Sequence, residues 1–210
     1  MTPAIYSLER LQTHLVLQID ILTNCAVILN NLNRLKAPIN RAEKRIVQSG
    51  FVTHLMVVYA NALVTDLDKV YSRSASQQQS FVHMFKHLRE DDYDSALLEA
   101  IRQGDLQDKE WSTVEDVRQG AKEFEDFFLS KDDTMKRLKH HRDKYSGHRD
   151  TGWKPDNLLS MGELNALTST AISIHGCITK NILLVEPAHD EVKKQLSIEE
   201  MLTAWSKSIE

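Results

Sequence analysis

The apolar residues of the first segment, about residues 5–35, recur every seven positions. Leu8, Leu15, Leu22 and Leu29 lie on one line, while Leu11, Cys25 and Leu32 lie on the neighbouring seam, which Gln18 interrupts. A seven-residue repeat of this kind keeps one apolar stripe of a helix facing a partner helix. The pattern predicts a long helix packed in a bundle, with an isolated coiled coil as the alternative. A contribution of the stripe to a dimer interface stays open.

A second helix is predicted from Pro38 to about Tyr71, because the missing N–H of proline costs nothing in a first turn. Its centre, residues 55–64, is apolar on nearly every face, so we expect it to be the most buried element. Asp66 and Asp68 near its end are expected to be solvated. Residues 72–80 contain only Ser, Gln, Arg and Ala, which predicts a short mobile loop.

Helical spacing of apolar residues continues through the second half of the chain. A short helix is predicted at about residues 81–90 and another at 96–101, and Thr113 or Ser112 is the expected N-cap of a third. The inward residues expected for the first and third of these are Phe81, Met84, Phe85, Leu88, Val114, Val117, Ala121, Phe124 and Phe128.

Two capping boxes predict the last helices, one formed by Ser160 with Glu163 and one by Ser197 with Glu200. Their expected inward residues are Leu164, Leu167, Ala171, Ile174, Ile178 and Val185, and then Leu202 and Trp205. No segment shows the alternation of a strand. The predicted fold class is all-α, a bundle of four to five main helices with short extra helices, forming one domain over residues 1–210 with C-terminal helices at 160–208.

Composition agrees with this architecture, because 7 Gly and 4 Pro in 210 residues leave little room for the turns of a large sheet. Cys25 and Cys177 lie far apart in apolar helical patterns and are expected to be free buried thiols. No signal peptide is expected. The most apolar run, residues 54–64, is about half the length that crosses a bilayer. We therefore expect a cytoplasmic protein without membrane contact.

Residues 135–149 concentrate positive charge on an otherwise acidic chain. They contain six Lys or Arg, one acid and three His, a net charge of +5 that leaves −9 for the rest. Asp132 and Asp133 suit the first turn of a helix that would contain this cationic segment. Met135, Leu138 and Tyr145 of that helix are expected to face the core. A local cationic patch predicts an anion-binding site rather than a general nucleic-acid coat, and the alternative is a solvated helix face.

Arg142 and His148 supply the chemistry that RNA cleavage requires without a metal. Arg offers a planar fork of donors suited to phosphate oxygens, and His exchanges protons near neutral pH. A base removes the proton of the 2′-OH, an acid protonates the leaving 5′-oxygen, and a cation stabilises the phosphorane. The two residues are six apart, roughly 120° out of line on an ideal helix. They meet on one substrate only if the helix unwinds at Gly147 or if two protomers converge.

The segment from Arg142 to His148, within a motif region at residues 135–150, resembles the Arg-x(4–6)-His signature of the HEPN superfamily. It is most similar to the abortive-infection, AbiU-type branch, although Gly147 stands where Ala is more usual. The resemblance implies a helical bundle, often homodimeric, in which two facing motifs form one composite cleft. It also implies a metal-independent endoribonuclease that acts as a toxin or phage-defence effector, without a cofactor and with RNA and an antitoxin protein as partners.

By this resemblance each motif residue has an expected role. His148 is the acid and base, Arg142 stabilises the phosphate, and Asp143 orients one of them. Lys144, Arg149 and Tyr145 are the expected substrate-binding residues. His140 and His141 lie outside the signature and are expected to add cationic surface or to cap the helix C-terminus.

Two other functions remain open at this point. The first is a noncatalytic helical interaction or scaffold module. The second is a metal site at His83 and His87, whose four-residue spacing suits a metal, although a solvated helix face is the expected interpretation because no carboxylate or Cys partner is evident nearby.

Overall fold

The computed structural model describes residues 4–74, 77–103, 109–146, 158–183, 198, 202, 203 and 207. The described helices are α1 (Leu8–Lys36), α2 (Arg41–Val47), α3 (Gly50–Tyr71), α4 (Phe81–Glu90), α5 (Ser95–Arg102), α6 (Val114–Ser130), α7 (Asp132–Ser146) and α8 (Met161–Ile178), which a π-helical turn, η1 (Thr179–Leu183), continues. Two-residue strands, β1 (Ile5–Tyr6) and β2 (Asp92–Tyr93), pair in parallel. The all-α prediction is confirmed.

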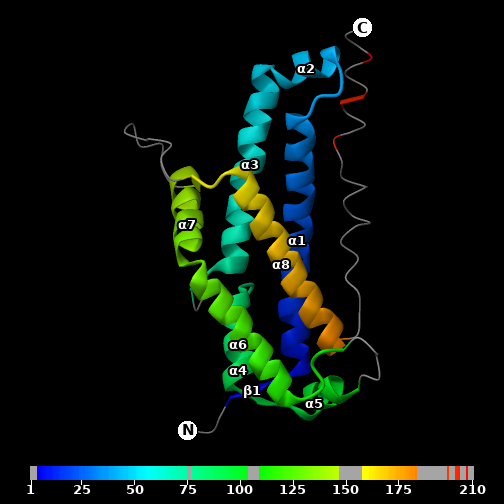
Figure 1. Ribbon diagram of the computed structural model, residues 1–210, viewed down its shortest axis with the longest axis vertical. Helices are drawn as coiled ribbons and strands as arrows, with labels where there is room; N and C mark the ends of the chain where they lie inside the picture. Colours follow the sequence, from blue (N-terminus) through cyan, green and yellow to red (C-terminus); the bar gives the residue numbers. More distant parts are fainter. Residues whose placement is uncertain are drawn as a thin grey trace.

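The bundle is elongated, with α1, α3 and α8 packed together along its length and α7 packed against α3 (Figure 1). Helix α6 packs on α4 at the end that holds β1 and α5, and α2 lies at the opposite end (Figure 1). One core cluster runs through all the long helices, and a smaller one joins α2 to the start of α3.

The seven-residue stripe of α1 is buried inside the bundle. Leu15, Leu22 and Leu29 are 3%, 0% and 6% exposed, and the Ser7 side chain accepts a hydrogen bond from the Arg10 N–H to start the helix. The prediction of ordinary bundle packing is confirmed. The alternative, an isolated coiled coil, is wrong because other helices of the bundle cover the stripe.

The region predicted as one helix from Pro38 contains two. The Asn40 side chain accepts a hydrogen bond from the Glu43 N–H and starts α2, and the Ser49 side chain accepts one from the Val52 N–H and starts α3. Pro38 precedes both helices. Two local N-caps, each satisfying a backbone donor that a helix leaves unpaired, explain the division.

The expectation that residues 55–64 form the most buried element is wrong. Leu63 and Val64 are fully buried, whereas Val57 and Val58 are 46% and 47% exposed. The reason is that α7 lies beside the second half of α3, where Arg142 pairs with Asp68 (Figure 1). The first half of α3 therefore keeps an exposed apolar side.

Helices α1 and α3 are each long and apolar enough, by length and composition alone, to cross a membrane. The most apolar window of α1 is 56% buried within the bundle, and that of α3 is 28% buried. Burial of this kind is compatible with core helices of a soluble protein, most clearly for α1.

The remaining helical predictions are mostly confirmed. Phe81, Met84, Phe85 and Leu88 of α4 are all fully buried. Capping boxes start α6 at Thr113 with Asp116 and α8 at Ser160 with Glu163. Leu202 is buried, while Val185, Trp205 and the capping box of Ser197 with Glu200 lie outside the described residues.

The burial of α1 gives a test of the fold. Leu22→Ala should lower the free energy of unfolding by about 2–5 kcal/mol, because it removes buried methyl groups and leaves a cavity. Val16→Ala on the same helix, where Val16 is 59% exposed, should change that free energy by less than about 0.5 kcal/mol. Urea denaturation of both variants measures the difference, and equal midpoints would contradict the packing of α1.

Candidate functional site

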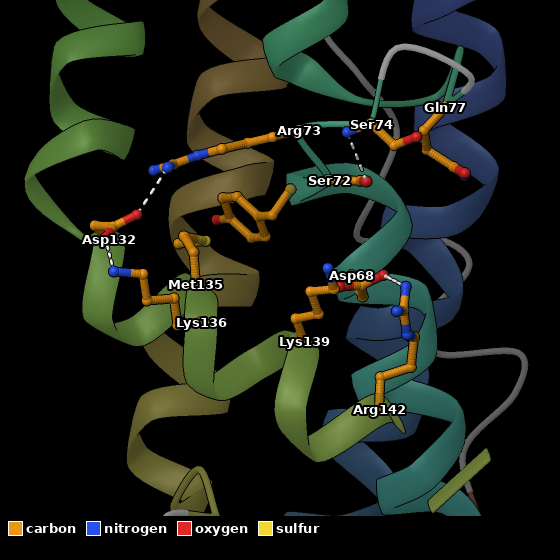
Figure 2. Close-up of a pocket in the computed structure, with 11 residues that line it drawn as sticks. Asp68, Ser72, Arg73, Ser74, Gln77, Asp132, Met135, Lys136, Lys139 and Arg142 are labelled. Carbon is orange, nitrogen blue, oxygen red and sulfur yellow. Dashed lines mark hydrogen bonds and ion pairs between the residues drawn. The ribbon is translucent and has the colours of Figure 1, made fainter. Parts of the chain in front are cut away.

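A cleft of about 610 Å³ opens between the end of α3, the segment that follows it, and α7. Its lining residues are Asp68, Tyr71, Ser72, Arg73, Ser74, Gln77, Asp132, Met135, Lys136, Lys139 and Arg142. Four of these described residues are cations and two are acids, so the described part of the lining is net positive. Figure 2 shows the charged side chains in two groups, Arg73 and Lys136 at Asp132 and Lys139 beside the pair of Asp68 and Arg142.

Helix α7 directs its polar residues to two sides. Lys136, Lys139 and Arg142 are three apart and line the cleft, as helical geometry requires of residues on neighbouring turns. Arg137 and His141 bond instead to the segment that leads into α8. Leu138, between the two sets, is 1% exposed and anchors the helix to the core, as predicted.

Arg142 is held in the cleft wall by two carboxylates. Its Nη1 donates to Asp68 Oδ2, and its Nε and Nη2 donate to Asp143 Oδ1 at 2.9 and 2.5 Å. The bonds to Asp143 raise the pKa of Arg142 above its ordinary value, so the guanidinium stays charged. Its orientation is therefore fixed before any ligand arrives.

Asp68 is 8% exposed, so the expectation of a solvated carboxylate is wrong. Burial raises the pKa of Asp68, and the nearby charge of Arg142 opposes that rise. Asp66 was also expected to be solvated, but it accepts hydrogen bonds from Asn24 Nδ2 at 2.5 Å and Lys69 Nζ at 2.8 Å. Sequence reasoning missed Asp68 because nothing in its neighbourhood indicates which turn of α3 faces α7.

Asp132 organises the other end of the cleft. Arg73 Nη1 lies 2.7 Å from Asp132 Oδ1, and Lys136 Nζ lies 2.5 Å from Asp132 Oδ2. The hydrogen bond from Lys136, followed by that from Arg73, lowers the pKa of Asp132. Arg73 was also missed, and its only sequence signal is that it is the one charged residue in the Ser- and Gln-rich segment at 72–80.

Lys139 follows Lys136 by one turn of α7, and its side chain lies beside the pair of Asp68 and Arg142 (Figure 2). Among the described residues, no ion pair or hydrogen bond engages its ammonium group, whereas the other three cations of the lining each contact a carboxylate. An anion that enters the cleft would therefore meet, side by side, an oriented guanidinium and an ammonium group without a hydrogen-bonded partner among the described residues. Charge-assisted hydrogen bonds of this type are the strongest that such a ligand can form.

The structure describes some of the site residues predicted from the sequence and leaves others outside its described part. Arg142 lines the cleft and is bonded to Asp143, which is not among the lining residues, and Lys144 is half-buried on the next position of α7. Tyr145 belongs to α7, but its side chain lies outside the described part of the structure, as do His148 and Arg149. No His or Cys lines the described cleft. The described residues thus provide cations whose arrangement suits an anion, while anion binding itself and the proton transfers assigned to His148 stay predictions.

Arg137 and His141 stabilise the structure rather than forming part of the cationic surface. Arg137 donates to Glu163 Oε1 at 2.5 Å and to the Leu158 carbonyl at 2.8 Å, and it lowers the pKa of Glu163 to about 2. His141 is 5% exposed and its Nδ1 accepts a hydrogen bond from the Leu159 N–H. Burial lowers the pKa of His141 to about 4, so it is neutral at pH 7 and its prediction as extra cationic surface is wrong.

His83 and His87 do not form a solvated face. Their ring centroids are 4.7 Å apart, and the ring of His14 lies 5.6 Å from that of His83. His14 Nδ1 is hydrogen-bonded to the Tyr6 hydroxyl, and His87 Nδ1 lies 2.7 Å from Asp91 Oδ2. Within the described ranges, no group of three or more His, Cys, Asp or Glu residues has the geometry of a metal site. The cluster packs α1 and β1 against α4.

Comparisons of the chain with protein-family models, with curated proteins and with solved structures each found no match. The interpretation of the cleft therefore depends on its own residues.

Stability should fall on acidification because of the buried histidines. The pKa of His141 is about 4 in the folded protein, below its ordinary value of 6.5, so its contribution is complete above pH 6.5 and is lost as the pH falls towards 4. The expected loss from this residue is of order 3 kcal/mol. Urea denaturation between pH 7.5 and 4.5 measures it.

His141→Asn keeps an acceptor for the Leu159 N–H but cannot take up a proton, so its stability should depend less steeply on pH than that of the wild type. His140→Asn, at the exposed neighbouring position, is the matched control and should keep the wild-type slope. The same slope in all three proteins would show that His141 is not the titrating group.

Proposed function

We propose that the protein is an HEPN-like RNA-binding effector with metal-independent endoribonuclease activity, of the kind used in toxin or phage-defence systems. The observation that carries the proposal is the position of Arg142, the arginine of the signature, in the wall of a net positive cleft beside Lys139. An arginine on a solvated helix face would lack such surroundings. The cleft therefore favours an anion-binding role for the motif.

The dimensions of the cleft suit the backbone of an RNA strand. Lys136 and Arg142 are six residues apart on α7, which separates their Cα atoms by about 9 Å along the helix axis. With Lys139 between them and Arg73 opposite, the cations can contact more than one phosphate group of a strand. Backbone contacts of this kind position a nucleic acid without selecting its sequence.

The proposed chemistry divides between binding and proton transfer. Arg142, oriented by Asp68 and Asp143, stabilises the negative charge that grows on the phosphorane oxygens when the 2′-oxygen attacks. His148 accepts the proton of the 2′-OH and donates a proton to the leaving 5′-oxygen. The reaction requires the 2′-OH and is therefore selective for RNA over DNA.

The composite site of a homodimer is part of the proposal. Arg142 and His148 are six residues apart and do not face one substrate on a single ideal helix. In a homodimer they can meet, because one cleft can take each residue from a different protomer. The exposed apolar side chains of Val57 and Val58 on α3 support it, since they offer a surface that a second copy would cover. An antitoxin protein is a second proposed partner.

The same surface of α3 favours a second candidate function, a noncatalytic interaction module. In that case the protein would bind a partner through Val57 and Val58, and the cationic cleft would contribute binding alone.

The catalytic proposal is tested by RNA cleavage. His148→Ala should lower the cleavage rate by about 10²–10⁴-fold, and Arg142→Ala by about 10²–10³-fold through loss of charge stabilisation. His140→Ala, which changes an exposed His of α7 outside the cleft lining, is the control and should cleave as the wild type does. Equal activity of wild type and His148→Ala would remove the catalytic assignment and leave the interaction module.

The composite site is tested by mixing two inactive variants. If Arg142 of one protomer works with His148 of the other, unfolding and refolding Arg142→Ala and His148→Ala together should restore about a quarter of wild-type activity, since half of the dimers then contain one intact site of two. Each variant refolded alone is the control. Activity that stays at the level of the separate variants would show that both residues act from the same chain.

A further inference from the structure

The end of the bundle that holds α2 carries a second cationic surface, which is separate from the cleft between the end of α3 and α7. Residues 34–51 contain five Lys or Arg and a single acid, Glu43. Glu43 is 4% exposed, and its carboxylate accepts hydrogen bonds from Arg34 Nη2 and the Ile39 N–H, both at 2.8 Å. The one negative charge of this region is therefore buried and compensated.

Four cations remain exposed here, Lys36, Arg41, Lys44 and Arg45. Among the described residues, none of the four side chains takes part in an ion pair or a hydrogen bond. We call these four residues, together with Pro38 and Ile39, the basic tip. Its groove encloses about 650 Å³ and is lined by Pro38, Ile39, Asn40, Arg41, Lys44, Arg45 and Gln48, so none of its described lining residues is an acid.

Ile39 projects from the middle of these charges. It is 74% exposed, more than any other large hydrophobic residue in the described part of the chain. Its backbone is fixed by the hydrogen bond to Glu43, and the next residue, Asn40, is the N-cap of α2. An apolar side chain is thus presented to solvent from a rigid backbone and surrounded by cations.

Charge is also distributed unequally along the molecule. Residues 90–126 contain 13 acids and four Lys or Arg, a net charge of −9, against +4 at residues 34–51. Helix α5 and the start of α6, which belong to the acidic segment, lie at the end of the long axis opposite α2 (Figure 1). A charged surface would therefore attract one end of the bundle and repel the other, which orients the molecule.

We propose that the basic tip docks on a membrane surface that contains anionic phospholipids, with Ile39 inserted between the headgroups. Cations around a protruding aliphatic residue match the two components of such a surface, its negative charge and its apolar interior. None of the described residues of the groove lining is an aromatic residue on which a base of single-stranded RNA would stack. A second copy docked through the same tip would bring like charges together.

This site is independent of the proposed RNA chemistry, and the proposal differs from the sequence-based expectation of no membrane contact. The long axis of the bundle would then point out of the membrane plane, with the basic tip at the membrane and the acidic end in solvent. Each Lys or Arg near an anionic surface strengthens binding by about fivefold. Removal of three should weaken it by about 100-fold.

Vesicle co-sedimentation of the full chain tests the proposal. The wild type should bind vesicles of phosphatidylcholine with 30 mol% phosphatidylserine and should dissociate from them as the salt concentration rises. It should not bind vesicles of phosphatidylcholine alone. The triple variant R41Q/K44Q/R45Q should lose about 100-fold in binding, and Ile39→Asp should also bind more weakly. The matched control is K86Q/R102Q/K122Q, which removes three exposed cations elsewhere and should bind as the wild type does.

Thermal unfolding of every variant establishes that it is folded, and RNA cleavage by R41Q/K44Q/R45Q should equal that of the wild type, which separates this site from the cleft. Equal binding by the triple variant and its control would overturn the proposal, as would absence of wild-type binding to the anionic vesicles. Binding of an acidic peptide or an RNA oligonucleotide that needs these three cations, without binding to vesicles, would assign the tip to another polyanion and would also overturn it.

Discussion

Helix α7 is attached to the bundle mainly by polar contacts, and the cleft depends on this attachment. Apart from Met135, Leu138 and Tyr145, the helix has no apolar residue of appreciable size, so little hydrophobic burial is available to hold it. Arg142 bonds it to Asp68 of α3, while Arg137 and His141 bond it to the segment before α8. These contacts replace an apolar face and leave one row of cations directed into the cleft.

The helices were predictable where local sequence decides the structure. The stripe of Leu15, Leu22 and Leu29, the N-cap at Thr113 and the capping box at Ser160 each depend on residues within one or two turns, and the structure contains all of them. The errors concern coverage by distant segments. Nothing near Val57 or Asp68 in the sequence reveals that α7 covers the second half of α3 and leaves the first half exposed.

The candidate site shows the same difference between what local sequence determines and what distant segments determine. The motif identified Arg142 and Asp143 from residue type and spacing, and their contact is local because they are neighbours on one helix. Arg73, Asp68 and Asp132 join them only through tertiary packing. His141 was wrongly predicted to lie on the surface because its neighbours are cationic. In the structure its side chain is buried. Charge density alone does not tell which side of a helix each residue occupies.

Glu163 connects two parts of the molecule that the sequence separates. Its carboxylate accepts hydrogen bonds from Ser160 in the capping box of α8, and it also pairs with Arg137 of α7. Fraying of the first turn of α8 would therefore release Arg137 as well, and loss of Arg137 would weaken that first turn. The wall of the cleft and the start of α8 should open and close as one cooperative unit, so the amide protons of the two segments should exchange with solvent at a common rate.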